Sequence, residues 1–154
     1  MKKADKRDAG VVLRMLFLVY CGLMLWLLFG QRLTGEGIAL SLHGTDNVNL
    51  IPFTTLKLYW RLLHMPVEKE LLRHAVINLA GNVVMFVPLG WFLPAIWEKF
   101  RGLFKTLLLS AVLIAAVEIC QYVTALGSCD VDDWILNLTG VLVGYGFCWL
   151  TRRK

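Results

Sequence analysis

Four long apolar runs constrain the fold of this chain more than any other feature of its sequence. They cover approximately residues 11–30, 74–97, 103–125 and 134–151. A helix needs about 20 apolar residues to cross the hydrocarbon core of a bilayer, and each run is close to that length. Apolar residues make up 58% of the 154 residues, and charged residues only 18%. A soluble core of this size could not bury so much apolar surface, so we predict an all-α membrane protein, a bundle of four transmembrane helices in a single domain over residues 1–154.

Basic residues flank the apolar runs and do not form one continuous face. The formal net charge is +5, and a protein that binds nucleic acid gathers such charge into a surface for phosphates. The basic clusters here are Lys2, Lys3, Lys6, Arg7 and Arg14; Lys99, Arg101 and Lys105; and Arg152, Arg153 and Lys154. Because Lys and Arg are retained on the cytoplasmic side of a membrane, we expect both termini in the cytoplasm and residues 31–73 as an outer loop. We expect the lipid bilayer as a partner and no nucleic acid.

Residues 54–64 of this loop show the pattern of a short amphipathic helix. Thr54 or Thr55 could cap this helix, and Pro66 would stop it. Basic and aromatic residues are interleaved along the segment, which is typical of a helix lying in the membrane interface. A loop helix packed on the bundle accounts for the pattern equally well.

Polar side chains recur at one depth within the apolar runs. Asn78 and Asn82 share a face of the second helix because they are four residues apart. Glu118 and Gln121 share a face of the third helix, and Asn137 lies near the start of the fourth. At a rise of about 1.5 Å per residue, these five residues lie roughly 6–12 Å below the outer surface. Three helices therefore bring polar groups into one shallow layer.

The same residues also have structural explanations. Asn and Gln often form hydrogen bonds between membrane helices, each worth about 0.6–2 kcal/mol. Asp130, with Asp133 three residues later, fits the N-cap of the fourth helix. The pattern of Asp130, Asp132 and Asp133 could bind a divalent cation, but capping explains it more simply, so we expect no metal and no cofactor. Glu118 differs, because an ionisable group within a span marks a functional site by default.

Small residues predict close packing of the helices. Gly140 and Gly144 form a G-x-x-x-G pattern on the fourth helix. Gly81 could play the same part on the second helix. Pro88 removes one helical hydrogen bond in the middle of the second span, which predicts a kink there.

Several motifs follow one another between residues 49 and 144. They are Asn49-Leu-Ile-Pro-Phe53; Asn78-x-x-Gly81-Asn82-x-x-x-Phe86-x-Pro88-x-Gly90-x-x-x-Pro94; and Glu118-x-x-Gln121, Asp130-Val-Asp-Asp133 and Asn137-x-x-Gly140-x-x-x-Gly144. In this order they resemble the VanZ-like family. The resemblance implies a multi-helix protein of the bacterial cytoplasmic membrane, and the founding member of the family is associated with teicoplanin resistance. One departure is an Arg that family members often carry before the acidic cluster, where this chain has Gly127-Ser128-Cys129.

The resemblance adds one residue of the outer loop to the candidate site. We call the whole set the polar layer: Asn49, Asn78, Asn82, Glu118, Gln121, Asp130, Asp133 and Asn137.

Three functions fit these observations. In the first, the polar layer binds a lipid, a lipid-linked cell-wall precursor or the acyl tail of a lipoglycopeptide, and lowers susceptibility to teicoplanin. In the second, the chain is a structural partner in a cell-envelope assembly. In the third, it is a membrane enzyme that uses Glu118 as general acid or base, with Asp133 as a second carboxylate, on a lipid-linked substrate. We favour binding over catalysis, because the sequence lacks a nucleophile–base arrangement.

Overall fold

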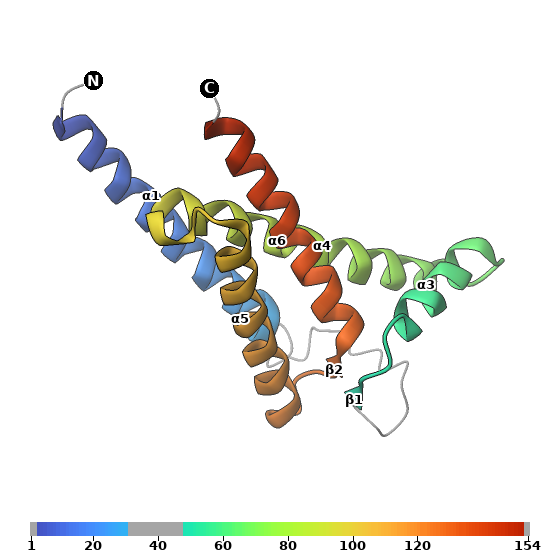
Figure 1. Ribbon diagram of the computed structural model, residues 1–154. Helices are drawn as coiled ribbons and strands as arrows, with labels where there is room; N and C mark the ends of the chain where they lie inside the picture. The colour runs from blue at the N-terminus through green and yellow to red at the C-terminus, as the bar shows by residue number, and fades with distance from the viewer. Residues whose placement is uncertain (1–2, 31–47, 153–154) are drawn as a thin grey trace.

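The computed structural model describes residues 3–30 and 48–152, and it is almost entirely helical (Figure 1). Its helices are α1 (Lys3–Leu25), continued by a π-helical turn η1 (Trp26–Gly30); α3 (Thr54–His64); α4 (Lys69–Ile96); the short 3-10 helix η2 (Glu98–Phe100); α5 (Leu103–Val123); and α6 (Val131–Arg152). Two short strands, β1 (Val48–Asn49) and β2 (Cys129–Asp130), pair in parallel. Part of the expected outer loop, residues 31–47, lies outside the described residues.

Four helices are long and apolar enough to cross a membrane: residues 8–30, 69–96, 103–123 and 131–152. This confirms the all-α fold with four spans, and α3 occupies the range expected for the short loop helix. The second span begins at Lys69 and the fourth at Val131, earlier than their apolar runs. The 28 residues of α4 reach about 42 Å. Because the hydrocarbon core is about 30 Å thick, α4 extends beyond it or is tilted within it.

The backbones of α4 and α6 approach each other closely because glycine lies at each contact. A Cβ at Gly144 would stand 1.9 Å from the carbonyl oxygen of Val87, and one at Gly140 would stand 2.0 Å from that of Val83. The contact is reciprocal, since a Cβ at Gly90 would stand 2.0 Å from a carbonyl oxygen of α6. Gly81, the other glycine expected at this contact, has no atom within 4 Å of such a Cβ. The close approach on α4 is therefore made by Gly90.

Pro88 lies inside α4, and the helix continues through it to Ile96. A proline cannot donate a hydrogen bond to the preceding turn, which weakens the helix at that point. Tyr20 of α1 donates its hydroxyl to the carbonyl oxygen of Met85 in that turn, at 2.9 Å. The contact fixes α1 against α4 beside the proline.

The apolar core lies where the four spans meet. Its buried residues are Met24, Phe86, Leu89, Leu93, Ile114 and Val141. Each of the four spans contributes at least one of these residues. The remaining long apolar side chains are largely exposed, as in a protein whose outer surface contacts lipid.

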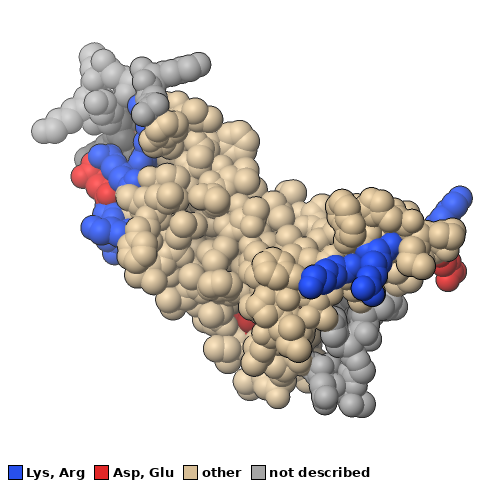
Figure 2. Space-filling model, turned by 45° about the vertical axis from the view of Figure 1, so that its right-hand side comes forward, with Lys and Arg blue, Asp and Glu red and all other residues tan. Residues whose placement is uncertain are grey.

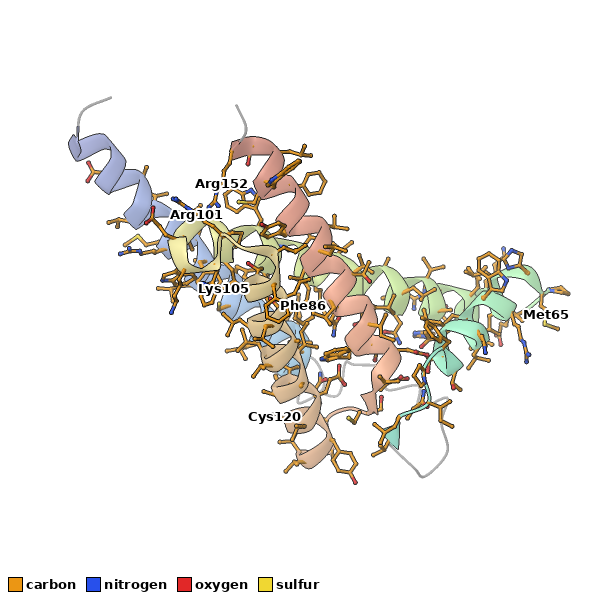
Figure 3. The ribbon with its side chains drawn as sticks, viewed as in Figure 1. Met65, Phe86, Arg101, Lys105, Cys120 and Arg152 are labelled. Atoms are coloured by element: carbon orange, nitrogen blue, oxygen red, sulfur yellow. The ribbon has the colours of Figure 1, made fainter. Side chains whose placement is uncertain are left out.

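The two ends of the bundle carry different groups. The start of α1 and the end of α6 lie at one end, and the paired strands lie toward the other (Figure 1). Arg101, Lys105 and Arg152 gather at the first end, whereas Cys120 lies toward the second (Figure 3). A broad surface of uncharged residues separates two groups of Lys and Arg (Figure 2). This distribution is that of a membrane protein with charged ends and an apolar middle.

Candidate functional site

The first turn of α3 is capped by a side chain from α6. One carboxylate oxygen of Asp132 accepts a hydrogen bond from the backbone N–H of Phe53 at 2.6 Å. The other accepts from Thr55 at 2.8 Å and from Leu56 at 3.1 Å. These N–H groups have no partner within their own helix. The expectation that Thr54 or Thr55 caps α3 is therefore wrong, since the cap lies more than 75 residues away in the chain.

A second carboxylate ties the segment before α3 to the start of α6. Asp130 accepts hydrogen bonds from the Thr55 hydroxyl at 2.5 Å and from the Asn49 side-chain amide at 3.1 Å. It also accepts one from the backbone N–H of Asp132 at 2.8 Å, which caps α6. We call these four residues, Asn49, Thr55, Asp130 and Asp132, the acidic clamp. The pairing of β1 with β2 places Asn49 opposite Asp130, and this completes the acidic clamp.

The carboxylates of the acidic clamp are occupied by hydrogen-bond donors of the protein itself. Asp130 and Asp132 are buried, and each carboxylate oxygen of the two accepts at least one N–H or O–H hydrogen bond. A cation would have to replace these donors. Within residues 3–30 and 48–152, no three His, Cys, Asp or Glu side chains are placed to hold a metal ion.

Asp133 does not complete the capping box that its spacing indicates. Its carboxylate accepts a hydrogen bond from the side-chain amide of Asn82 on α4, at 2.6 Å. The same amide nitrogen donates to Asn78 at 3.0 Å, and Asn78 donates to the hydroxyl of Tyr59 at 2.6 Å. We call Tyr59, Asn78, Asn82 and Asp133 the amide chain. It joins α3, α4 and α6.

The amide chain is less enclosed than the acidic clamp. Asn78, Asn82 and Asp133 are half-buried, and only Tyr59 is buried. Burial raises the pKa of the Tyr59 phenol, and the carboxylate of Asp133 raises it further. The phenol therefore stays protonated at neutral pH. Asn82 donates both of its N–H groups within the amide chain, so among the described residues the amides keep one N–H group of Asn78 and the side-chain oxygen of Asn82 for other partners.

One face of α5 is buried along the whole helix. Its buried residues recur about once per turn: Thr106, Ser110, Ile114, Glu118 and Gln121. The side chain of Gln121 donates to the carbonyl oxygen of Leu28 at 3.1 Å, which joins α5 to η1. Burial raises the pKa of the Cys129 thiol, and the charge of Glu118 raises it further. Glu118 lies on the buried face of α5, the helix that leads toward β2.

Asn137 is buried on α6, one turn beyond Asp133. Its side-chain oxygen, like the hydroxyl of Ser110, makes no hydrogen bond within residues 3–30 and 48–152. Trp134, one turn earlier on α6, donates to the carbonyl oxygen of Ala111 at 3.1 Å and so joins α6 to α5. Asn137 thus belongs to the interior between helices and not to either hydrogen-bonded group.

The polar layer is therefore not one continuous network. Asn49 and Asp130 belong to the acidic clamp; Asn78, Asn82 and Asp133 belong to the amide chain; Glu118 and Gln121 lie on α5; Asn137 lies inside the bundle. Thr55, Asp132 and Tyr59 were not among the residues expected in the polar layer. Only Asp132 carries a signal in the sequence, as the middle member of an acidic cluster.

The motifs that lie far apart in the chain meet in these two hydrogen-bonded groups. A family model described as VanZ/LLP1 matches residues 17–152. The chain belongs to the VanZ/LLP1 family. No curated protein and no solved structure matches it. In this VanZ/LLP1 protein the Asn49-Leu-Ile-Pro-Phe53 motif forms β1 and the turn into α3, and the acidic cluster of the third motif holds that turn in place.

Proposed function

We propose that the amide chain is a headgroup-binding site within the membrane. The observation that carries the proposal is the half-burial of Asn78, Asn82 and Asp133, which come from two helices and retain access to a ligand. Amide and carboxylate groups of this kind recognise the hydroxyl, amide and N–H groups of a lipid-linked cell-wall precursor or a lipid. Binding there lowers susceptibility to teicoplanin-type lipoglycopeptides, whose acyl tail reaches the same membrane layer.

In the same proposal the acidic clamp has a structural role. Its carboxylates are saturated by donors of the chain itself, so it positions α3 and with it Tyr59 of the amide chain. The amide chain is the part of the polar layer in which two helices bring half-buried amide and carboxylate groups together.

Resistance tests the proposal directly. A susceptible Gram-positive host would express the wild type, Asn82→Ala or Glu118→Gln, with membrane levels matched by immunoblot. We expect the wild type to raise the inhibitory concentration of teicoplanin and to leave that of vancomycin unchanged. Asn82→Ala should lower this protection about fivefold, the effect of losing one net hydrogen bond of about 1 kcal/mol.

The control for this experiment is Thr139→Ala, which removes an exposed hydroxyl of α6 that bonds only within its own helix. It should protect as well as the wild type. A wild type that gives no protection would refute the link to teicoplanin. Full protection by Asn82→Ala would refute the amide chain as the site, while full protection by Glu118→Gln would leave Glu118 a structural residue.

The proposal places the polar layer at the outer leaflet, which cysteine labelling can test. A variant without the four native cysteines would carry one new cysteine, either Ser128→Cys or Gly102→Cys. Position 128 lies between α5 and α6, and position 102 lies in the basic connection before α5. The positive residues near Gly102 favour the cytoplasm. We therefore expect a membrane-impermeant maleimide to label position 128 in intact cells, and position 102 only after permeabilisation. The reverse pattern would invert the topology.

A further inference from the structure

The outward face of α3 carries basic and aromatic side chains at helical spacing. Lys57, Trp60, Arg61 and His64 are all exposed, and they recur at intervals of three and four residues. Trp60 is 65% exposed, and its ring lies 4.3 Å from that of His64, centroid to centroid. We call these four residues the α3 outer face.

The opposite face of α3 is fixed to the rest of the protein. Thr55 is held by Asp130, and Tyr59 accepts a hydrogen bond from Asn78. Asp132 holds the first turn through three backbone N–H groups. Because these contacts determine how the helix is rotated about its axis, the α3 outer face is a defined surface.

The segment that carries the positive charges of this face contains no acidic residue. Residues 48–67 contain no Asp or Glu. Within the part of the chain that the structure describes, Lys57 and Arg61 form no ion pair, whereas Arg73 is paired with Glu70. Two unpaired cations beside an exposed indole are complementary to a phosphate-bearing partner.

The position of α3 indicates that this partner is a lipid. The helix follows the clamp at the start of α6 and leads into the start of α4, so it lies at the level where two spans enter the membrane. Exposed apolar side chains flank it at both ends: Leu50, Ile51, Phe53, Leu63 and Met65. Figure 2 shows Lys and Arg gathered at this end of the molecule, beside uncharged surface. Such a helix lies in the headgroup region with its apolar flanks in the acyl boundary.

We propose that the α3 outer face binds the phosphate headgroups of anionic phospholipids. Lys57 and Arg61 bind the phosphates, and Trp60 enters the interface between them. This surface is distinct from the amide chain, and it anchors α3 to the bilayer whichever ligand the amide chain takes.

Quenching of Trp60 fluorescence by brominated lipids tests the proposal. The full chain would be placed in nanodiscs that contain either brominated phosphatidylglycerol diluted in phosphatidylcholine, or brominated phosphatidylcholine diluted in phosphatidylglycerol, at equal mole fractions. The signal of Trp60 is the difference between the wild type and Trp60→Phe. We expect about fivefold stronger quenching by the anionic lipid, the preference that one basic residue near an anionic surface provides.

A charge-matched pair of variants separates this surface from general electrostatics. Lys57→Gln with Arg61→Gln should abolish the preference, whereas Lys69→Gln with Arg73→Gln, which removes the same charge at the start of α4, should retain it. Equal quenching by both lipids in the wild type would show that the α3 outer face does not select anionic headgroups. Absence of quenching by either lipid would show that Trp60 faces water or another part of the protein. Either result overturns the proposal.

Discussion

Alanine in place of Gly144 is expected to lower the melting temperature of the purified protein in detergent by about 10 °C, or to prevent its accumulation in the membrane. The added methyl group would stand 1.9 Å from the carbonyl oxygen of Val87 and 2.8 Å from its carbonyl carbon. Backbone atoms of a neighbouring helix cannot move aside as a flexible side chain can. The helices must separate, which costs about 3 kcal/mol or more.

Two other glycines make the matched controls. A Cβ at Gly146 on α6, or at Gly81 on α4, meets no atom within 4 Å. Alanine at either position should leave the melting temperature unchanged or raise it slightly, because alanine favours the helix by about 1 kcal/mol over glycine. If Gly144→Ala and Gly146→Ala melted at the same temperature, α4 and α6 would not be packed through their backbones.

The spans were predictable because hydropathy is a local property of the sequence. About 20 consecutive apolar residues suffice to identify a membrane helix, and each of the four was located this way. The first turn of α4 was not located, because this helix begins in a polar segment, whereas Asp130 was expected at the N-cap of α6 and caps it. Lys69 and Glu70 are helical although they are charged. Asp132 lies in the first turn of α6, and its carboxylate bonds to another element.

The candidate site was predictable only as a set of polar residues. Spacing places Asn78 and Asn82 on one face of a helix, and the two are indeed bonded to each other. Which neighbour each residue contacts depends on how the helices are rotated and how far they are shifted along one another. For this reason Asp133 bonds to Asn82 of α4, although its spacing favoured a local cap.

The packing glycines were also predictable only where both lie on one helix. Gly140 and Gly144 form a recognisable pair because both lie on one helix. Their counterpart on α4 could not be recognised in the same way, since Gly81 and Gly90 are nine residues apart and only the rotation of α4 turns Gly90 toward α6. Long-range pairing of β1 with β2 has no local signal at all, because each strand has only two residues.

Removal of the Asp132 carboxylate is expected to release α3 from the bundle. Asp132→Ala leaves the N–H groups of Phe53, Thr55 and Leu56 without their acceptor. Three lost hydrogen bonds to one buried carboxylate cost about 3–5 kcal/mol in total. The four spans do not depend on these bonds, so we expect local opening of residues 48–64 while the helices of the bundle stay folded.

Limited trypsin digestion in detergent measures this opening. Cleavage after Lys57 and Arg61 should be about 100-fold faster in Asp132→Ala than in the wild type, because the rate follows the population of the open form. Cleavage after Lys99, in the exposed connection before α5, supplies the internal control and should not change. The cleavage rate of Asp132→Asn should lie between those of the wild type and Asp132→Ala. Its amide keeps one acceptor oxygen but turns an N–H group toward the remaining donors.

The pattern of cleavage distinguishes a local cap from a general loss of stability. If Asp132→Ala accelerated cleavage after Lys99 as much as after Lys57, the acidic clamp would be holding the whole bundle and not α3 alone. If neither site became more sensitive, the three backbone bonds would contribute nothing measurable to the position of α3. In that case Tyr59 would be held against Asn78 by the packing of α3 on α4, and the amide chain would be independent of the acidic cluster.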